Sequence, residues 1–277
     1  LVVYPNSNGY FWDDGRTEAE LLMPAGPQSD LTFVTMLIDQ LASDYGLDTP
    51  SVYLVGFDGG GGFAYRIACE MSEQITGMAV VTTTMWDYHY QMCPDEGDPL
   101  DVLLLHAGRD VFYPDEGRVI PGRARDYTIT TLDGTATFWT EWNNCVGEPT
   151  YYARDRVRVY SDCSNETETV IYRMPQAGHH WMRIADEYRL NQFGMDATHI
   201  ITEWVMGEVD WSATEITSVP LPPVPRTYRL YVPTTYDPAE STPMIMVLHG
   251  RPDNGLGIAV ITEMNRVAEE NGFIAVY

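Results

Sequence analysis

The stretch S-V-Y-L-V-G-F-D-G-G-G-G-F-A-Y-R-I-A, residues 51–68, decides the fold that we expect. Its first part, 52–56, is apolar and mostly β-branched and predicts a buried strand, while 63–68 predicts the beginning of a helix. The glycine-rich turn between them has the form of a nucleophile elbow. In that turn the motif G-x-S-x-G exposes a nucleophile on a strained strand-to-helix connection, and small neighbours let the backbone crowd together.

The residue at the centre of this turn is an aspartate. Gly56 and Gly60 occupy the two glycine positions of the motif, and Asp58 stands where the serine belongs. A serine activated by a histidine attacks a carbonyl carbon, whereas a carboxylate attacks a different range of electrophiles or none. The sequence therefore indicates the fold more directly than the function.

Strands and helices alternate along the chain, which indicates an α/β fold with a largely parallel sheet and helices on both faces. Besides 52–56, we expect strands at 1–4, 75–84, 101–106, 169–174, 226–233, 243–250 and 273–277. We expect further helices at 30–45, 137–145, 197–206 and 261–271.

One proline-rich segment divides the chain. Residues 1–207 are expected to form the main part of a single domain, and 208–225 a linker. Four prolines between Pro220 and Pro225 predict semi-rigid polyproline structure in that linker. Residues 226–277 would complete the same domain in cis or a neighbouring subunit in trans. At about 3.3 Å per residue, the linker is long enough for either arrangement.

The charge of the chain excludes some classes of partner. The 277 residues carry a formal net charge of −24, and all sixteen basic residues are arginines. Such a surface repels nucleic acid and anionic membranes. No motif for a cofactor and no C-x-x-C metal spacing occurs, so we expect neither a cofactor nor a metal.

The cysteines favour an oxidising compartment. Cys69 with Cys93, and Cys145 with Cys163, are two pairs of modest separation, which suggests disulfides, although buried free thiols would give the same count. Asn165 begins the glycosylation sequon N-E-T. Neither a signal-peptide pattern nor an apolar run of transmembrane length is present, and the chain reads as a processed or excised segment of a secreted protein.

Two further residues follow strands at positions suited to chemistry. Asp110 comes just after the strand at 101–106, and His179 lies on the loop after the strand at 169–174. In open α/β sheets, ligand chemistry gathers at the carboxyl ends of the strands, although an ordinary loop aspartate or histidine would fit the same positions.

These motifs together resemble the secreted polyhydroxybutyrate depolymerase and feruloyl esterase group of α/β-hydrolases. That group has strands like R-T-Y-R-L-Y-V-P, M-V-L-H-G and F-I-A-V-Y, a G-x-S-x-G-G elbow, an H-G-x-x-D turn and a G-H-x-W loop. The counterparts in this chain are 226–233, 246–250, 273–277, 56–61, 106–110 and 178–181. The resemblance covers most of the chain and implies an α/β-hydrolase fold.

The resemblance also implies a role for each matching position. Asp58 falls at the nucleophile, Asp110 at the acid that orients the base, and His179 at the base. The backbone of Gly59 and the pair Gly250–Arg251 fall at the oxyanion hole. Asp110 and His179 match the group, but the nucleophile position does not.

The order of the motifs is rotated relative to the group. What the group places first, 226–277, stands last here, which implies a circularly permuted element order. Moreover, L-V-V-Y at 1–4 and I-A-V-Y at 274–277 are versions of the same strand. A simple permutation needs no such overlap, whereas an array of tandem hydrolase-like repeats would produce both the rotation and the overlap.

We therefore hypothesise a secreted, esterase-like α/β-hydrolase repeat without serine-hydrolase activity and with a structural role. It would associate with itself through 226–277 and the strand at 1–4, building a head-to-tail filament by strand exchange. The alternative is an active hydrolase, esterase-like or dehalogenase-like, that uses Asp58 as nucleophile with His179 and Asp110. A third hypothesis is a module that binds a carbohydrate or another polymer through the old cleft and its tryptophans, and a polymer or a small ester is the ligand that we expect.

Overall fold

The computed structural model describes most of the chain. The described residues are 2–7, 11–15, 30–46, 52–121, 126–153, 155–182, 196–209, 211, 230–237, 242–250 and 255–276. Arg251 and residues 212–225 of the expected linker lie outside them.

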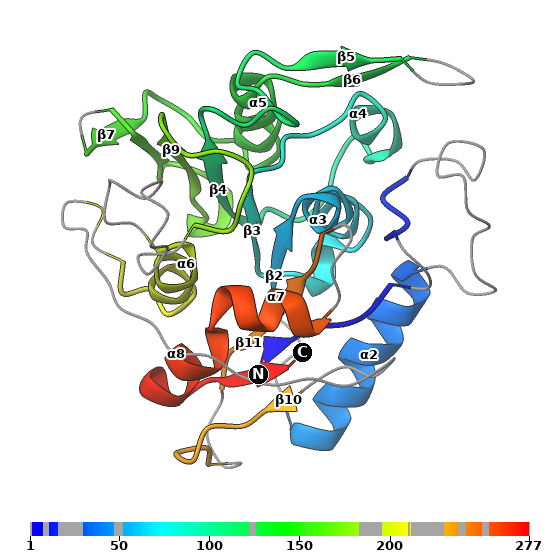
Figure 1. The fold of residues 1–277 in the computed structure, drawn as a ribbon, viewed down its shortest axis with the longest axis vertical. Coiled ribbons are helices and arrows are strands. Elements are labelled where there is room, and N and C mark those ends of the chain that lie inside the picture. The colour runs from blue at the N-terminus through cyan, green and yellow to red at the C-terminus, as the bar shows by residue number, and fades with distance from the viewer. Residues whose placement is uncertain are drawn as a thin grey trace.

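The main sheet is mostly parallel, as the alternation of strands and helices predicts. Its strand order is β1-β10-β12-β11-β2-β3-β4-β9-β8-β7, and the run from β12 through β9 is parallel (Figure 1). The strands are β1 (Val2–Val3), β10 (Leu230–Tyr231), β12 (Ile274–Val276), β11 (Met244–Leu248), β2 (Val52–Phe57), β3 (Gly77–Val81), β4 (Asp101–Ala107), β9 (Thr169–Met174), β8 (Val157–Tyr160) and β7 (Thr150–Tyr152). The chain therefore has the α/β fold expected from its sequence.

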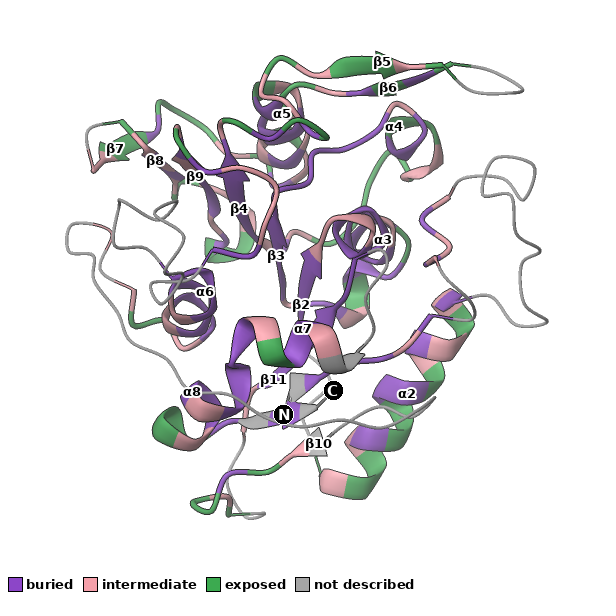
Figure 2. Cartoon of the chain, viewed as in Figure 1, coloured by how far each residue is buried: buried purple, intermediate pink, exposed green. Residues whose placement is uncertain are grey.

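Helices cover both faces of this sheet and enclose two hydrophobic cores. One core lies under α2 (Asp30–Tyr45), α3 (Gly59–Glu70) and α5 (Leu132–Trp142), and the other under α6 (Ala197–Val205), α7 (Gly255–Thr262) and α8 (Met264–Asn271). Successive residues of a strand point to opposite faces, so in β4 Leu104 joins the first core, whereas Leu103 and Leu105 join the second. The central strands are accordingly buried on both sides (Figure 2).

Some local elements differ from the sequence-based expectation. The helix expected at 261–271 is broken into α7 and α8 at Glu263, whose φ is 51°, in the left-handed region. The sequence analysis did not anticipate the short helix α4 (His89–Met92) or the two-stranded hairpin of β5 (Arg118–Ile120) and β6 (Tyr127–Ile129). These elements are short, so neither has the periodic pattern that a longer element would show.

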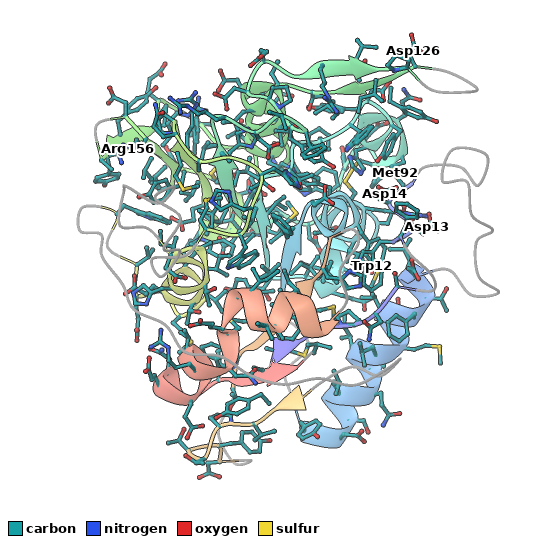
Figure 3. All side chains as sticks on the ribbon, viewed as in Figure 1. Trp12, Asp13, Asp14, Met92, Asp126 and Arg156 are labelled. Carbon is teal, nitrogen blue, oxygen red and sulfur yellow. A yellow bond between two sulfur atoms is a disulfide. The ribbon has the colours of Figure 1, made fainter. Side chains whose placement is uncertain are left out.

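The segment 11–15 packs beside α3 (Figure 3). The ring of Trp12 stacks on that of Phe63 with centroids 4.9 Å apart, and Arg66 forms an ion pair with Asp13 at 2.5 Å. Trp12 also contacts the ring of His249, at the end of β11, with centroids 5.7 Å apart. This segment therefore connects the helix that follows the elbow with the end of the strand beside it.

The two ends of the chain meet in the same part of the sheet, where the N and C labels lie together (Figure 1). β1 and β12 each pair antiparallel with β10 and parallel with β11. Val2 and Ala275 have the same two partners, Tyr231 and Ile245. Likewise, Val3 and Val276 both pair with Leu230 and Met246.

Both cysteine pairs expected from the sequence are disulfides. Cys69 bonds to Cys93 and Cys145 to Cys163, with sequence separations of 24 and 18 residues. Among the described residues, no helix combines the length and the apolar character needed to cross a membrane.

We expect the bond between Cys69 and Cys93 to stabilise the fold chiefly by restricting the unfolded chain. The double variant Cys69→Ser/Cys93→Ser should lose about 3 kcal/mol of unfolding free energy, since the closed loop is of moderate length. Urea denaturation followed by tryptophan fluorescence measures the loss. Cys145→Ser/Cys163→Ser, which opens a shorter loop, should lose slightly less. An unchanged urea midpoint in both double variants would contradict this prediction.

Candidate active site

The elbow predicted from the sequence is present, with Asp58 at its tip. Asp58 joins β2 to α3 with φ 51° and ψ −123°, a conformation that a non-glycine residue adopts only under strain. Its carbonyl oxygen accepts hydrogen bonds from the Thr83 hydroxyl and the Gly61 backbone N–H, both at 2.9 Å. These bonds hold the backbone in the strained conformation.

Gly56 is required by the close approach of the two arms of the elbow. A Cβ atom at this position would lie 2.5 Å from the carbonyl oxygen of Gly60, closer than any non-bonded carbon and oxygen can approach. Only glycine therefore lets β2 and the first turn of α3 approach so closely.

The structure brings Asp58, Asp110 and His179 together. Asp110 follows β4 and His179 follows β9, so both lie beyond the carboxyl ends of parallel strands, as Asp58 does. Nδ1 of His179 is 2.8 Å from Oδ2 of Asp110, and Nε2 is 3.5 Å from Oδ1 of Asp58. One imidazole therefore lies between two carboxylates. We refer to these three side chains as the site triplet.

Asp110 is fixed by its own loop. Its carboxyl group is fully buried, and its Oδ1 accepts hydrogen bonds from the backbone N–H groups of Phe112 and Tyr113 at 2.8 and 3.0 Å. An aspartate that accepts from the N–H groups two and three residues ahead forms a local turn. The sequence D-V-F-Y is compatible with this turn, but our sequence analysis did not identify it.

Aromatic rings surround the imidazole of His179. Phe57 and Tyr113 stack on it with centroids 5.3 and 5.8 Å away, and Phe112 meets it edge-on at 4.8 Å. The His179 side chain is consequently only 15% exposed. Sequence analysis missed these three rings, although each is adjacent in sequence to Asp58 or within three residues of Asp110.

The two carboxylates decide the charge of His179. Burial alone would lower its pKa, but the hydrogen bonds and negative charges of Asp110 and Asp58 outweigh burial and raise the pKa to about 9. His179 is therefore an imidazolium ion at neutral pH. In this state it donates a hydrogen bond to Asp110, forms an ion pair with Asp58, and has no lone pair with which to accept a proton.

The expected oxyanion side of the site is partly described. Gly59 is the first residue of α3, where backbone N–H groups lack partners within the helix. Gly250 follows β11 and approaches Asp58 so closely that a Cβ atom there would lie 2.8 Å from Cβ of Asp58. Arg251, assigned to the same region by resemblance, lies outside the described residues.

A second charged cluster holds the loop that carries Asp110. Arg173 binds Asp115 through two nitrogens, and Nε2 of the buried His106 lies 3.2 Å from Oδ1 of Asp115. Partial burial would raise the pKa of Asp115, but the bonds from His106 and Arg173 lower it to about 2. Asp115 thus stays ionised and ties this loop to β9. Sequence analysis did not identify this cluster.

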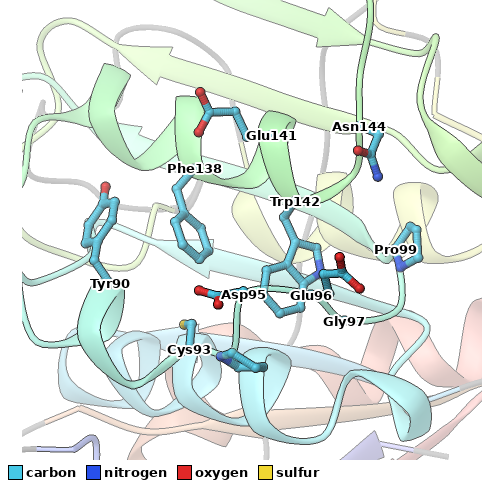
Figure 4. Close-up of a pocket in the computed structure, with 11 residues that line it drawn as sticks. Tyr90, Cys93, Asp95, Glu96, Gly97, Pro99, Phe138, Glu141, Trp142 and Asn144 are labelled. Carbon is cyan, nitrogen blue, oxygen red and sulfur yellow. The ribbon is translucent and has the colours of Figure 1, made fainter.

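A pocket of about 470 Å³ lies away from the site triplet (Figure 4). Its walls include Tyr90, Asp95, Glu96, Phe138, Glu141 and Trp142, and none of the site triplet lines it. In the described part of the chain, no group of three or more metal-ligating side chains is arranged to hold a metal ion. The sequon residue Asn165 is exposed on a turn with φ 56°.

The chain is similar to fungal esterases. It is 25% identical over 177 residues to the "Probable feruloyl esterase C" of Aspergillus clavatus, which covers 62% of this chain and 54% of that protein. It is 25% identical over 148 residues to "Feruloyl esterase C" of Emericella nidulans, covering 52% and 48% of the two chains. It is 28% identical over 90 residues to "Probable feruloyl esterase C" of Aspergillus niger, covering 32% of each chain.

No known family profile matches the chain. The chain spans about half the length, or less, of the curated relatives that it matches. The matches therefore support an esterase-like family for this α/β fold.

The charge of His179 should make stability depend on pH. Because its pKa is raised from 6.5 to about 9 in the folded chain, its contribution is fully present below pH 6.5 and is lost as pH rises through 9. We expect the unfolding free energy to fall by up to about 3 kcal/mol over this range. Urea titrations at several pH values measure it.

His180→Gln, at the neighbouring histidine, should keep this decline, whereas His179→Gln should remove it. A wild-type chain whose stability is constant from pH 6.5 to 10 would show that the triplet does not hold a proton.

Proposed function

We propose that this chain is an esterase-fold unit that has lost serine-hydrolase activity and acts as an extracellular structural repeat. The two disulfides and the fungal esterase relatives support an extracellular setting. The loss of activity and the structural role rest on separate features of the molecule, the site triplet and the sheet.

The charge state of the site triplet carries the proposal of lost activity. An esterase needs a neutral histidine that removes a proton from a serine hydroxyl. Here the attacking group is missing, and His179 is instead protonated between Asp58 and Asp110. An ion triplet of this kind holds three loops together but has no base at neutral pH.

The structural role is supported by the sheet and its two cores. Strands from both ends of the chain pair with the same two strands of the main sheet, β10 and β11, and helices bury both faces of that sheet. We propose that the chain associates with further copies of itself through 226–277 and the strand at 1–4, by docking of the C-terminal segment onto the next copy. A head-to-tail contact of this kind extends without closing.

Activity measurements test the loss of catalysis. We expect no release of product from 4-nitrophenyl acetate or methyl ferulate by the wild-type chain beyond that of Asp58→Ala. Asp58→Ser removes one of the two carboxylates beside His179 and restores a hydroxyl, so it should exceed Asp58→Ala by about tenfold or more. Wild-type hydrolysis that disappears in Asp58→Ala would contradict the proposal.

Association is tested by size-exclusion chromatography with light scattering, together with negative-stain images. We expect species larger than the 31.3 kDa chain, increasing with protein concentration. Monomers alone at all concentrations would contradict head-to-tail assembly and would leave a unit whose C-terminal segment docks in cis.

A second candidate function is favoured by one observation, the strained backbone that presents Asp58 beside His179. In a hydrolase of this kind, Asp58 displaces halide from an alkyl halide and forms an alkyl ester. Esterification removes the negative charge of Asp58, which lowers the pKa of His179 and frees it to activate water. Water then releases the alcohol and a proton, and Asp58 is regenerated.

Halide release from 1-bromobutane distinguishes this candidate. His179→Gln would retain the butyl ester, which mass spectrometry detects on the peptide that contains Asp58. Asp58→Asn, similar in shape and uncharged, is the matched control and should form no ester. Absence of both halide release and the ester would eliminate this candidate.

A further inference from the structure

The position in the sheet between β10 and β11, called here the gap, has room for one strand. Two strands of the chain, β1 and β12, are candidates for it. In the structure, the registers of β1 and β12 against both neighbours coincide at every shared position. Each side of a strand offers one row of N–H and C=O groups, and each row bonds one neighbour. β1 and β12 are therefore alternative occupants of one position in the sheet.

The other side of β11 is not open to the second strand. Val247 and Leu248 pair with Val55 and Gly56 of β2, which leads into Asp58. A strand excluded from the gap thus has no second position beside β11. The chain accordingly carries one strand more than this part of the sheet accommodates, whether 226–277 docks in cis or in trans.

The two strands are related by a constant offset. Val2 and Ala275, like Val3 and Val276, are 273 residues apart, as their shared partners show. The described side chains agree with this offset: Ala275 lies in the second core, and so does Tyr4, two residues beyond Val2, the counterpart of Ala275. The sequence similarity and the sheet register thus give the same offset.

We infer that the gap between β10 and β11 is a docking position for one strand, and that the second occupant is the equivalent strand of a successive copy of this chain. In a head-to-tail repeat with a period of 273 residues, the strand at 274–277 stands at the position that the strand at 1–4 has in the next copy. Each copy then has one strand for one position. This inference rests on the proposed structural role and adds the position in the sheet at which successive copies join and the period of the repeat.

The occupant of the gap also supports the site. β11 lies between the gap and β2, and it ends next to Gly250, which contacts Asp58. The Trp12 ring, which follows β1 in the chain, contacts His249 at that same end. In a repeat, the part of the chain that follows the docked strand therefore packs directly against the end of β11. That end of β11 forms one wall of the site that the same part of the chain carries.

Proline substitution tests whether the two strands are interchangeable. Proline removes a backbone N–H and is not tolerated in a central strand, so it excludes the strand that carries it. We expect Val3→Pro and Val276→Pro each to shift the melting temperature by less than about 2 °C, because the other strand fills the gap. The double variant, with neither strand competent, should melt about 6–12 °C lower or fail to fold.

Val80→Pro is the matched control. Val80 lies in β3, which pairs with β2 and β4 and has no alternative occupant. This single substitution should be as harmful as the double variant. If either Val3→Pro or Val276→Pro is as harmful as Val80→Pro, the strands are not interchangeable and the inference is overturned. The inference is also overturned if each single variant has a large decrease in melting temperature and the decrease in the double variant is only their sum.

A fused chain tests the partner. In it, residues 1–273 are followed directly by residues 1–277, so the strand at the junction serves both copies. We expect this fused chain to melt at a higher temperature than the single chain. The reason is that the docked C-terminal segment of the first copy is then covalently continuous with the second copy. Melting at the single-chain temperature would overturn a successive copy as partner. Both tests measure folding, so their failure is distinct from any finding of activity or of monomers.

Discussion

The parallel pairing of β11, β2, β3, β4 and β9 is the constraint on which the site depends. Parallel strands end at the same edge of a sheet, so residues that follow them meet although they are far apart in sequence. Gly250 follows β11, Asp58 follows β2, Asp110 follows β4 and His179 follows β9. The register of the sheet and the strained turn at Asp58 then bring the side chains to within hydrogen-bonding or ion-pair distance.

Electrostatics rather than geometry separates this site from that of a serine hydrolase. The imidazole and its orienting carboxylate stand as such chemistry requires, with 2.8 Å between Nδ1 of His179 and Oδ2 of Asp110. The added carboxylate of Asp58 holds a proton on the ring. A group that would accept a proton from a hydroxyl thus becomes part of a stabilising ion triplet, while the backbone that presents Asp58 keeps its strain. This combination explains why a degenerate unit is the better-supported proposal.

The relation between β1 and β12 connects the fold with assembly. A sheet position is specified by its backbone pairing, and these two strands have the same register against the same two neighbours. In a protein that repeats with the spacing of these two strands, every such position in the sheet receives one strand. The proposal of a repeat therefore rests on hydrogen-bonding capacity and does not depend on the chemistry of the site triplet.

Local pattern in the sequence was sufficient to predict the α/β fold, the elbow around Asp58, the strands that precede Asp110 and His179, and both cysteine pairs. These features depend on periodicity, turn chemistry and short separations, which neighbouring residues specify. Two others needed the tertiary structure: the Arg173–Asp115 bond, and the coincident registers of β1 and β12. Each arises from groups that are distant in sequence and meet only after folding, so their distances, burial and competition for the same hydrogen bonds are not encoded in any local stretch.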